Sequence, residues 1–171
     1  LMGNNTAQGI AENSSDNVVI GKNAMCASCS CEVSSTVIIG SNAGVNNRAS
    51  GSTFIGTLSG YSNTTGCYNT FLGTQSGFCN TTGSSNTFLG RNSGFSNTTG
   101  SDNTFLGIQS GFSNTTGYYN TFLGMNSGYS NTTGSDNTFL GESSGHDNTT
   151  GIQNTFVGTN SGCWNSTGCY N

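Results

Sequence analysis

Residues 103–119 read Asn103-Thr-Phe-Leu-Gly-Ile-Gln-Ser-Gly-Phe-Ser-Asn-Thr-Thr-Gly-Tyr-Tyr119, and this stretch decides the fold because the chain repeats it. The opening motif Asn-Thr-Phe-Leu-Gly, with Val replacing Leu in the last copy, recurs at a constant step of 17 residues. A fixed period of this kind indicates a repeat architecture in which each repeat is one structural unit. The copies begin at Asn69, Asn86, Asn103, Asn120, Asn137 and Asn154.

The consensus is N-T-F-L-G-x-x-S-G-[FY]-x-N-T-T-G-x-x, and its 17 places are called coil positions 1 to 17. A further matching copy begins at Ser52. Looser copies contain Val37-Ile38-Ile39-Gly40 and Val18-Val19-Ile20-Gly21, offset by one or two residues from the regular period. The sequence therefore predicts about nine coils. We divide it into residues 1–35, an irregular N-terminal region with a degenerate coil and a Cys cluster, and residues 36–171, the regular repeats.

A 17-residue period is too short for two helices and a turn. Gly at three fixed positions, with β-branched or aromatic residues between them, instead indicates strand, corner, strand, corner. The predicted fold class is all-β, a β-solenoid or β-roll with one repeat per turn. The recurrent Gly residues are expected to supply positive φ angles at the corners.

Equivalent residues of successive coils should stack about 4.8 Å apart along the axis, so the Phe at position 3 predicts a core ladder. Neighbouring residues in a strand point to opposite faces, so the apolar residues at positions 3 and 4 cannot both fill the interior. We expect one face to fill the coil and the other to meet a second chain, three chains around an axis being the natural arrangement for a rod. The ladder residues are Phe54, Phe71, Phe88, Phe105, Phe122, Phe139 and Phe156.

Two families contain similar repeats. Residues 17–24, Asn-Val-Val-Ile-Gly-Lys-Asn-Ala, resemble the head repeats of trimeric autotransporter adhesins, and residues 103–117 are similar to the 17-residue repeats of tail-fibre-like proteins. The resemblance covers roughly residues 17 to 171. It implies a homotrimeric left-handed β-roll on a cell or virion surface, and hence an extracellular location. Cysteines are unusual in such repeats, and the chain shows no coiled-coil stalk, membrane anchor or C-terminal chaperone domain.

The composition disfavours several classes of function. Only three residues are basic and seven acidic, and the basic ones, Lys22, Arg48 and Arg91, are scattered, whereas nucleic-acid binding needs clustered Lys and Arg. No apolar run approaches the roughly 20 residues that span a bilayer. We therefore expect no nucleic-acid partner and no membrane insertion.

The seven cysteines are all disulfide candidates in an oxidising compartment, and their odd number favours some pairing between chains. A zinc site at Cys26-x-x-Cys29-x-Cys31 lacks a nearby fourth ligand, so no metal or cofactor is expected. The candidates are Cys26, Cys29, Cys31, Cys67, Cys79, Cys163 and Cys169.

Asn-x-Ser/Thr glycosylation motifs recur at position 12. The competing interpretation is an amide ladder of stacked Asn side chains, and glycans about 4.8 Å apart would also crowd one another. The candidate acceptors are Asn63, Asn80, Asn97, Asn114, Asn131, Asn148 and Asn165.

Catalysis is disfavoured. His146 and Asp147 are adjacent but we expect no nucleophile nearby, and Asp102 and Asp136 share a coil position in an otherwise uniform ladder without a cleft. We expect a non-enzymatic structural fibre or filament subunit, such as the shaft of a surface adhesin or viral fibre, with itself as partner in a homotrimer or an end-to-end filament.

A carbohydrate- or receptor-binding module is the alternative, since the aromatics at position 10 could stack on sugars and the breaks in the pattern, residues 22–36, His146 and Trp164, could mark a site. An ice-binding role is weaker. Thr98 and Thr99, at positions 13 and 14, are adjacent and should point opposite ways, so they form no Thr-x-Thr array.

Overall fold

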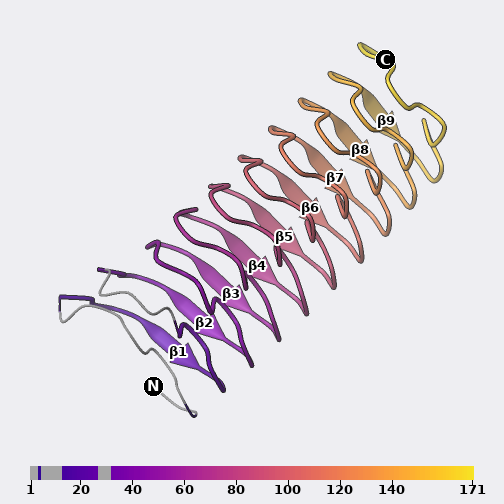
Figure 1. Cartoon of the computed structure of the whole chain (residues 1–171). Helices are drawn as coiled ribbons and strands as arrows, with labels where there is room; N and C mark the ends of the chain where they lie inside the picture. Colours follow the sequence, from indigo (N-terminus) through magenta and orange to yellow (C-terminus); the bar gives the residue numbers. More distant parts are fainter. Residues whose placement is uncertain (1–3, 5–12, 27–31) are drawn as a thin grey trace.

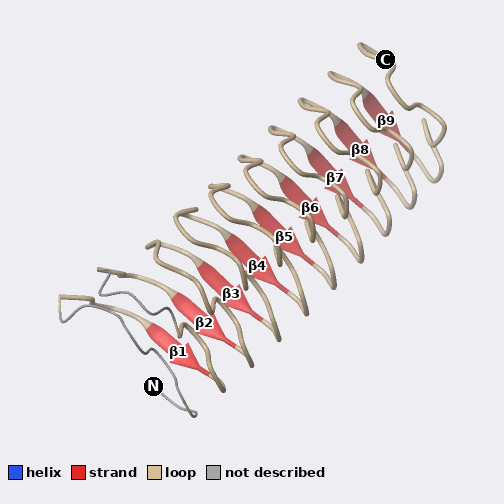
Figure 2. Ribbon diagram, in the orientation of Figure 1, coloured by secondary structure: helices blue, strands red, loops and turns tan. Residues whose placement is uncertain are grey.

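The computed structural model describes residues 4, 13–26 and 32–171, which form a single stack of coils with the two chain ends at opposite ends (Figure 1). The described residues are all-β, with no helix and one three-residue strand per coil (Figure 2). The strands are β1 (Val18–Ile20), β2 (Val37–Ile39), β3 (Thr53–Ile55), β4 (Thr70–Leu72), β5 (Thr87–Leu89), β6 (Thr104–Leu106), β7 (Thr121–Leu123), β8 (Thr138–Leu140) and β9 (Thr155–Val157).

The nine strands form one parallel sheet in sequence order, so the predicted β-solenoid is confirmed. Equivalent positions pair in every step, as Phe105 does with Phe88 and Phe122. The step is 19 residues from Val18 to Val37 and 16 from Val37 to Thr53, and it is 17 thereafter. The N-terminal coils thus absorb their extra or missing residues outside the strands. Val19 and Ile38 stay in register with the Phe column.

A column of Phe side chains fills the interior beneath the sheet. Six rings, from Phe54 to Phe139, are fully buried, and Phe156 in the last coil is partly buried. Consecutive ring centroids lie 4.7 to 5.1 Å apart with nearly parallel planes. Leu106, next to Phe105, points outward and is 39% exposed. The strand therefore buries one face and leaves the other uncovered, as alternation along a strand requires.

In the regular coils the rest of the interior is mainly polar, and hydrogen bonds between coils satisfy its Ser and Asn columns. Ser110, at position 8, is buried and donates its hydroxyl to the carbonyl of Phe122 at 3.0 Å. Asn103, at position 1, donates to the carbonyl of Gly117 at 2.8 Å. Because burying such groups without partners would cost free energy, these columns set the distance and the register between coils.

The sequence also predicted a second strand in each coil, and this was wrong: the described residues contain one strand per coil. The chain after β6 turns sharply because Gln109 and Gly111 both adopt left-handed backbone conformations, with φ of 56° and 60°. Asn114 then closes a turn by donating its amide to the carbonyl of Gly117 at 3.1 Å. Backbone hydrogen bonds still join this side of the coil to the next coil, as from the Ser113 N–H to the Tyr129 carbonyl at 2.9 Å, but the left-handed corners break the segment into turns.

The predicted role of Gly holds at two of its three positions. Gly107 and Gly111, at positions 5 and 9, have positive φ, whereas Gly117 at position 15 does not. Position 15 needs Gly for another reason, since a Cβ on Gly117 would collide with the carbonyl oxygen of Gly134 in the next coil. Non-Gly residues at positions 7 and 17, such as Gln109 and Tyr119, supply the other left-handed corners.

Candidate functional site

One regular surface is the outer face of the nine-stranded sheet, which we call the strand face. It consists of the side chains at positions 2 and 4, mainly Thr and Leu, and none of them is charged. Leu72, Leu89 and Leu106 are each about two-fifths exposed. A regular apolar column of this kind is more than the scattered exposed residues that soluble proteins normally carry.

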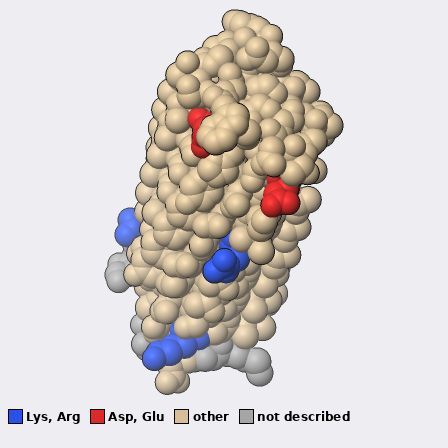
Figure 3. Space-filling view, turned by 90° about the vertical axis from the view of Figure 1, so that its right-hand side faces the viewer, with Lys and Arg blue, Asp and Glu red and all other residues tan. Residues whose placement is uncertain are grey.

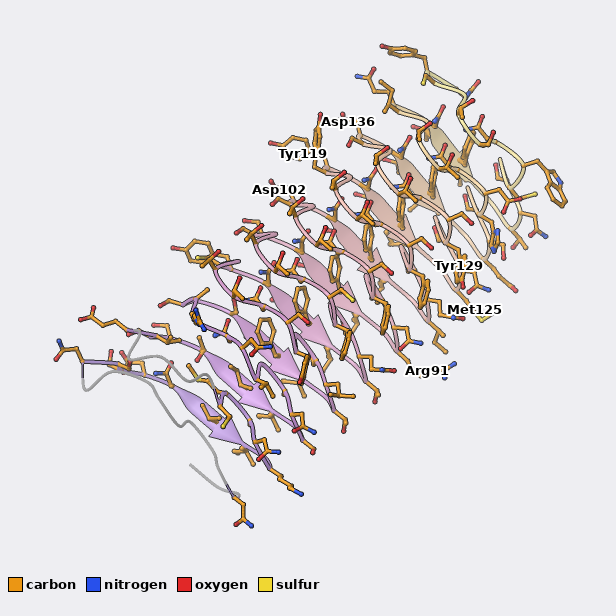
Figure 4. All side chains as sticks on the ribbon, in the orientation of Figure 1. Arg91, Asp102, Tyr119, Met125, Tyr129 and Asp136 are labelled. Carbon is orange, nitrogen blue, oxygen red and sulfur yellow. The ribbon has the colours of Figure 1, made fainter. Side chains whose placement is uncertain are left out.

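Charged side chains lie along the two edges of the strand face. Figure 4 shows Arg91, at position 6, beyond one end of the strands, and Asp102 and Asp136, at position 17, beyond the other. Lys22 shares position 6 with Arg91, and Asp16 shares position 17 with Asp102. Glu142 departs from this pattern because it lies at position 6 near the level of Asp136. On the face drawn in Figure 3, Lys, Arg, Asp and Glu side chains are few and well separated.

A second aromatic column runs outside the coil at position 10. Tyr61, Phe78, Phe95, Phe112 and Tyr129 stack with centroids 5.0 to 5.2 Å apart. His146 continues the column, with its imidazole 5.2 Å from the Tyr129 ring and 5° from parallel. These rings are half-buried because their faces cover one another. Only their edges are open to a ligand, so the column itself offers few free ring faces for sugar stacking.

The position-10 column ends at a cleft of about 350 Å³, which we call the His146 cleft. Here the His146 Nδ1 lies 2.6 Å from the Asp147 Oδ1, and both side chains are about one-third exposed. The carboxylate accepts the hydrogen bond, so Nδ1 carries the proton in the neutral imidazole and Nε2 remains unprotonated. The lining residues are Ser143, His146, Asp147, Asn160, Cys163 and Trp164.

Sequence reasoning identified His146 and Trp164 as breaks in the pattern but missed that they share a cleft with a thiol. Cys163 follows His146 by one period, and Asn160 follows Ser143 by one period, so the repeat itself contained this signal. The expectation that no nucleophile lies near His146 is therefore corrected, since Cys163 and Ser143 line the same cleft. Cys163 takes the ladder position next to the imidazole, which places it over the ring face and not in the ring plane, where Nε2 accepts a proton.

A second cleft, of about 340 Å³, lies at the opposite edge of the strand face. Tyr118 and Tyr119 pack edge to face here, with centroids 5.4 Å apart. Asp102 lines this cleft and Asp136 does not, so the two carboxylates do not meet in one site. The lining residues are Thr99, Ser101, Asp102, Thr116, Tyr118 and Tyr119.

The glycosylation candidates lie inside the rod. Asn114 is fully buried, and its Nδ2 donates one hydrogen to the Oδ1 of Asn97 at 2.7 Å and the other to the carbonyl of Gly117. An N-linked glycan replaces one of these hydrogens and needs room outside, so this environment favours the amide-ladder interpretation, and glycosylation stays a prediction. Asn63, Asn80, Asn97, Asn131 and Asn148 are equally buried, and Asn165 is half-buried with the same two bonds.

The cysteines described outside the N-terminal cluster form no disulfide: Cys67, Cys79, Cys163 and Cys169 are thiols. Cys67 and Cys169 share position 16 six coils apart, which at about 4.8 Å per coil is far beyond disulfide reach. Burial raises the pKa of the Cys79 thiol. Cys26 is half-buried, and Cys29 and Cys31 lie outside the described residues. Pairing between chains stays a prediction.

The two adjacent Thr columns, at positions 13 and 14, differ in their surroundings, as adjacent residues in an extended segment should. Thr98, at position 13, donates its hydroxyl to the carbonyl of Thr115 at 3.0 Å, while Thr99 at position 14 is exposed. The described residues contain no group of three or more His, Cys, Asp or Glu arranged to hold a metal ion. They also contain no helix long and apolar enough to cross a bilayer.

The fold and its surfaces define a parallel β-solenoid repeat protein with one flat, uncharged sheet face and two small clefts at the edges of that face. Comparison with protein-family models, curated proteins and solved structures found no match to this chain.

Proposed function

We propose that this protein is a non-catalytic structural subunit of an extracellular fibre or filament, and that it associates with copies of itself through the strand face. The observation that carries the proposal is the column of exposed Leu and Ile side chains, which is regular, uncharged and parallel to the rod axis. Covering such a column removes apolar area from water at about 25 cal/mol per Å².

A second copy of the chain is the partner that fits best, because it has the same spacing between coils along its whole length. Cyclic symmetry keeps equivalent coils at one axial level and brings one edge of the strand face against the opposite edge of the neighbour. In a parallel arrangement, Arg91 would then face Asp102, and Lys22 would face Asp16, each within one coil step, while Glu142 and Asp136 would form one unfavourable pair. Exposed ion pairs contribute at most about 1 kcal/mol each, so they would set register and direction more than affinity.

Three copies around an axis, and the extracellular setting, rest on the resemblance of the motif to trimeric adhesin and tail-fibre repeats. The uniform Phe, Ser and Asn columns support a role in carrying mechanical force, since the same hydrogen bonds join each regular coil to the next.

The test is the mass of the native particle by light scattering, with its shape by electron microscopy. We expect a rod with the mass of three chains. Leu106→Asp places a charge on the strand face and should give single chains, while Ser113→Asp, which copies Asp147 at position 11 on another side of the rod, should leave the assembly intact. A wild-type particle with the mass of one chain would overturn the proposal.

Charge exchange tests the direction of association. Arg91→Asp should weaken the assembly by putting an acidic group opposite Asp102. Adding Asp102→Arg exchanges the two charges and should restore it. If the exchanged variant assembles no better than Arg91→Asp alone, the parallel register is wrong even if the strand face is the interface.

A further inference from the structure

Four residues that break the repeat lie together at one place on the rod. Positions 10 and 11 hold His146 and Asp147 in the β8 coil, and Cys163 and Trp164 in the β9 coil. All four line the His146 cleft. In the five preceding coils the same two positions hold an aromatic ring followed by Ser or Cys: Tyr61-Ser62, Phe78-Cys79, Phe95-Ser96, Phe112-Ser113 and Tyr129-Ser130.

The cleft arises from these side chains and not from any distortion of the coils. The backbone N–H of Asp147 donates to the carbonyl of Cys163 at 2.9 Å, as Cys79 does to Phe95. Asn160 likewise donates to the carbonyl of Glu142 at 2.9 Å. Because the short Cys163 side chain takes the place of a ring at position 10, the stack of rings stops at His146. Space therefore opens beside the imidazole.

Several polar groups line this space. Some are already held by a hydrogen bond, and some can still form one. The hydrogen bond from His146 Nδ1 to Asp147 orients both side chains and leaves Nε2 and the second carboxylate oxygen available. Asn160 adds an amide that has no side-chain hydrogen bond to any residue in the described part of the chain, and Ser143 adds a hydroxyl. Acceptors and donors are thus mixed within one small cleft.

Trp164 supplies a flat apolar surface at the cleft. It is 85% exposed, the most exposed of the large hydrophobic residues in the described chain. Its indole combines a broad apolar face with one N–H donor, so it is well suited to bind a ligand that has one apolar face and one polar edge. Cleft volumes of a few hundred Å³ also suit a small ligand.

We propose that the His146 cleft binds a neutral pyranose sugar unit. The C–H face of the pyranose would stack on the Trp164 indole, and its hydroxyls would bond to Asp147, Asn160 and His146 Nε2. The Asp147 carboxylate and the lack of Lys or Arg in the cleft disfavour anionic sugars. This inference is independent of self-association and assigns the rod one local recognition site.

Trp164 is the only Trp in the chain, so its fluorescence reports on the site directly. The intact chain is titrated with neutral hexoses, N-acetylhexosamines and oligosaccharides that end in them. We expect a saturable change in Trp fluorescence and slower quenching by acrylamide. A single stacked sugar with a few hydrogen bonds should bind with Kd of about 1 mM.

The matched variant repairs the repeat. His146→Phe with Asp147→Ser installs the Phe-Ser pair already present in the β5 and β6 coils, so the rod should fold with an unchanged melting temperature. Sugar affinity should fall about tenfold or more, because at least one charge-assisted hydrogen bond is lost. Tyr119→Ser, in the second cleft, should leave affinity unchanged. Leu106→Asp should also bind normally, which separates this proposal from self-association.

Three results would overturn the proposal. They are the absence of a saturable Trp change with every neutral sugar, equal sugar affinity in the repaired variant, and preferential binding of sialylated or sulfated sugars. Preferential binding of a nucleoside or another planar aromatic compound, measured in the same titration, would likewise show that the cleft does not recognise pyranose chemistry.

Discussion

The coils of β1 and β2 and the coils of β4 to β8 align their strands in one register but have different interiors. In the regular coils, Phe fills position 3 and Ser fills position 8, as in Phe105 and Ser110. In the N-terminal coils these places hold Ile38 and Ala43, or Val19 and Ala24, and all four are buried. The strands still pair in register across the boundary. The solenoid therefore needs a buried apolar column at position 3 but not an aromatic one.

The two regions differ again at position 9. Gly111 occupies it in the β6 coil, where a Cβ would collide with the Phe105 ring. Met25 occupies it in the first coil, with a similar left-handed φ of 46°. The ladder residue there is Val19, whose short side chain leaves room for a side chain at position 9. Gly at this position is thus required by the Phe column as much as by the backbone.

The largest expected effect comes from charging the inner column. Phe105→Asp buries an unpaired carboxylate in the ladder and should unfold the rod, since such burial costs several kcal/mol. The matched control is Leu106→Asp, one residue away on the outer face, which should keep its circular dichroism spectrum and still melt cooperatively, even where it separates the chains. Equal melting curves for Phe105→Asp and the wild type would contradict the burial of the column.

Removing an amide from the middle of the Asn column should have the next largest effect. Asn114→Ala leaves Asn97, Asn131 and Gly117 each without one partner, and should lower the free energy of unfolding by about 2 to 4 kcal/mol. Asn47→Ala, at the N-terminal end of the column, leaves fewer partners unpaired and should cost about half as much. Urea denaturation measures the free energy of unfolding of both variants. Equal losses would contradict a continuous hydrogen-bonded column of Asn side chains.

The position-9 comparison gives a double-mutant cycle. Gly111→Ala combines left-handed strain with a collision against Phe105 and should cost about 2 to 3 kcal/mol. In a Phe105→Val background, which imitates the first coil, the same change should cost only about 1 kcal/mol, because the collision is gone. The free energies come from urea denaturation. Purely additive costs would show that Met25 is tolerated for some other reason.

The smallest effect concerns Cys79, where the other coils carry Ser62, Ser96, Ser113 and Ser130. Burial raises the pKa of this thiol, so the folded rod holds the thiol proton more tightly than the unfolded chain. That contribution to stability is present below the unfolded pKa and is lost as the pH rises through the folded pKa.

Stability should therefore fall slightly above pH 9, and Cys79→Ser should remove this one component. Melting temperatures of the two proteins across alkaline pH measure the difference. Alkylation of Cys79 near pH 8 should also be slower in the folded rod than in urea. Identical alkaline profiles for the wild type and the Ser variant would contradict the shift.

Most of the fold was predictable because the period contains it. The step of 17 residues placed Phe71 on Phe88 and predicted the parallel stack, and alternation along the strand predicted which of Phe105 and Leu106 points inward. The missing second strand was not predictable in this way. The chain turns instead through left-handed conformations at Gln109 and Tyr119, and neither residue type predicts a left-handed backbone.

The candidate sites were less predictable. The Asn-x-Ser/Thr motif at Asn114 fits both glycosylation and an amide ladder, and only the burial of the side chain distinguishes the two interpretations. His146 and Trp164 stood out as departures from the repeat, but their partners Ser143 and Asn160 are ordinary residues at position 7. A cleft depends on how much space neighbouring side chains leave, which a pattern of residue types does not state.

The amino-acid sequence by itself determined the repeat, the parallel stack of coils and the inner Phe column, because a strict period allows only equivalent residues to be neighbours. Only the tertiary structure decided which polar residues turn inward, where the chain turns without Gly, and that four departures from the repeat meet in one cleft. The physical reason is that these features depend on three-dimensional closure of each coil, where hydrogen-bond partners and free volume come from residues 12 to 17 positions away.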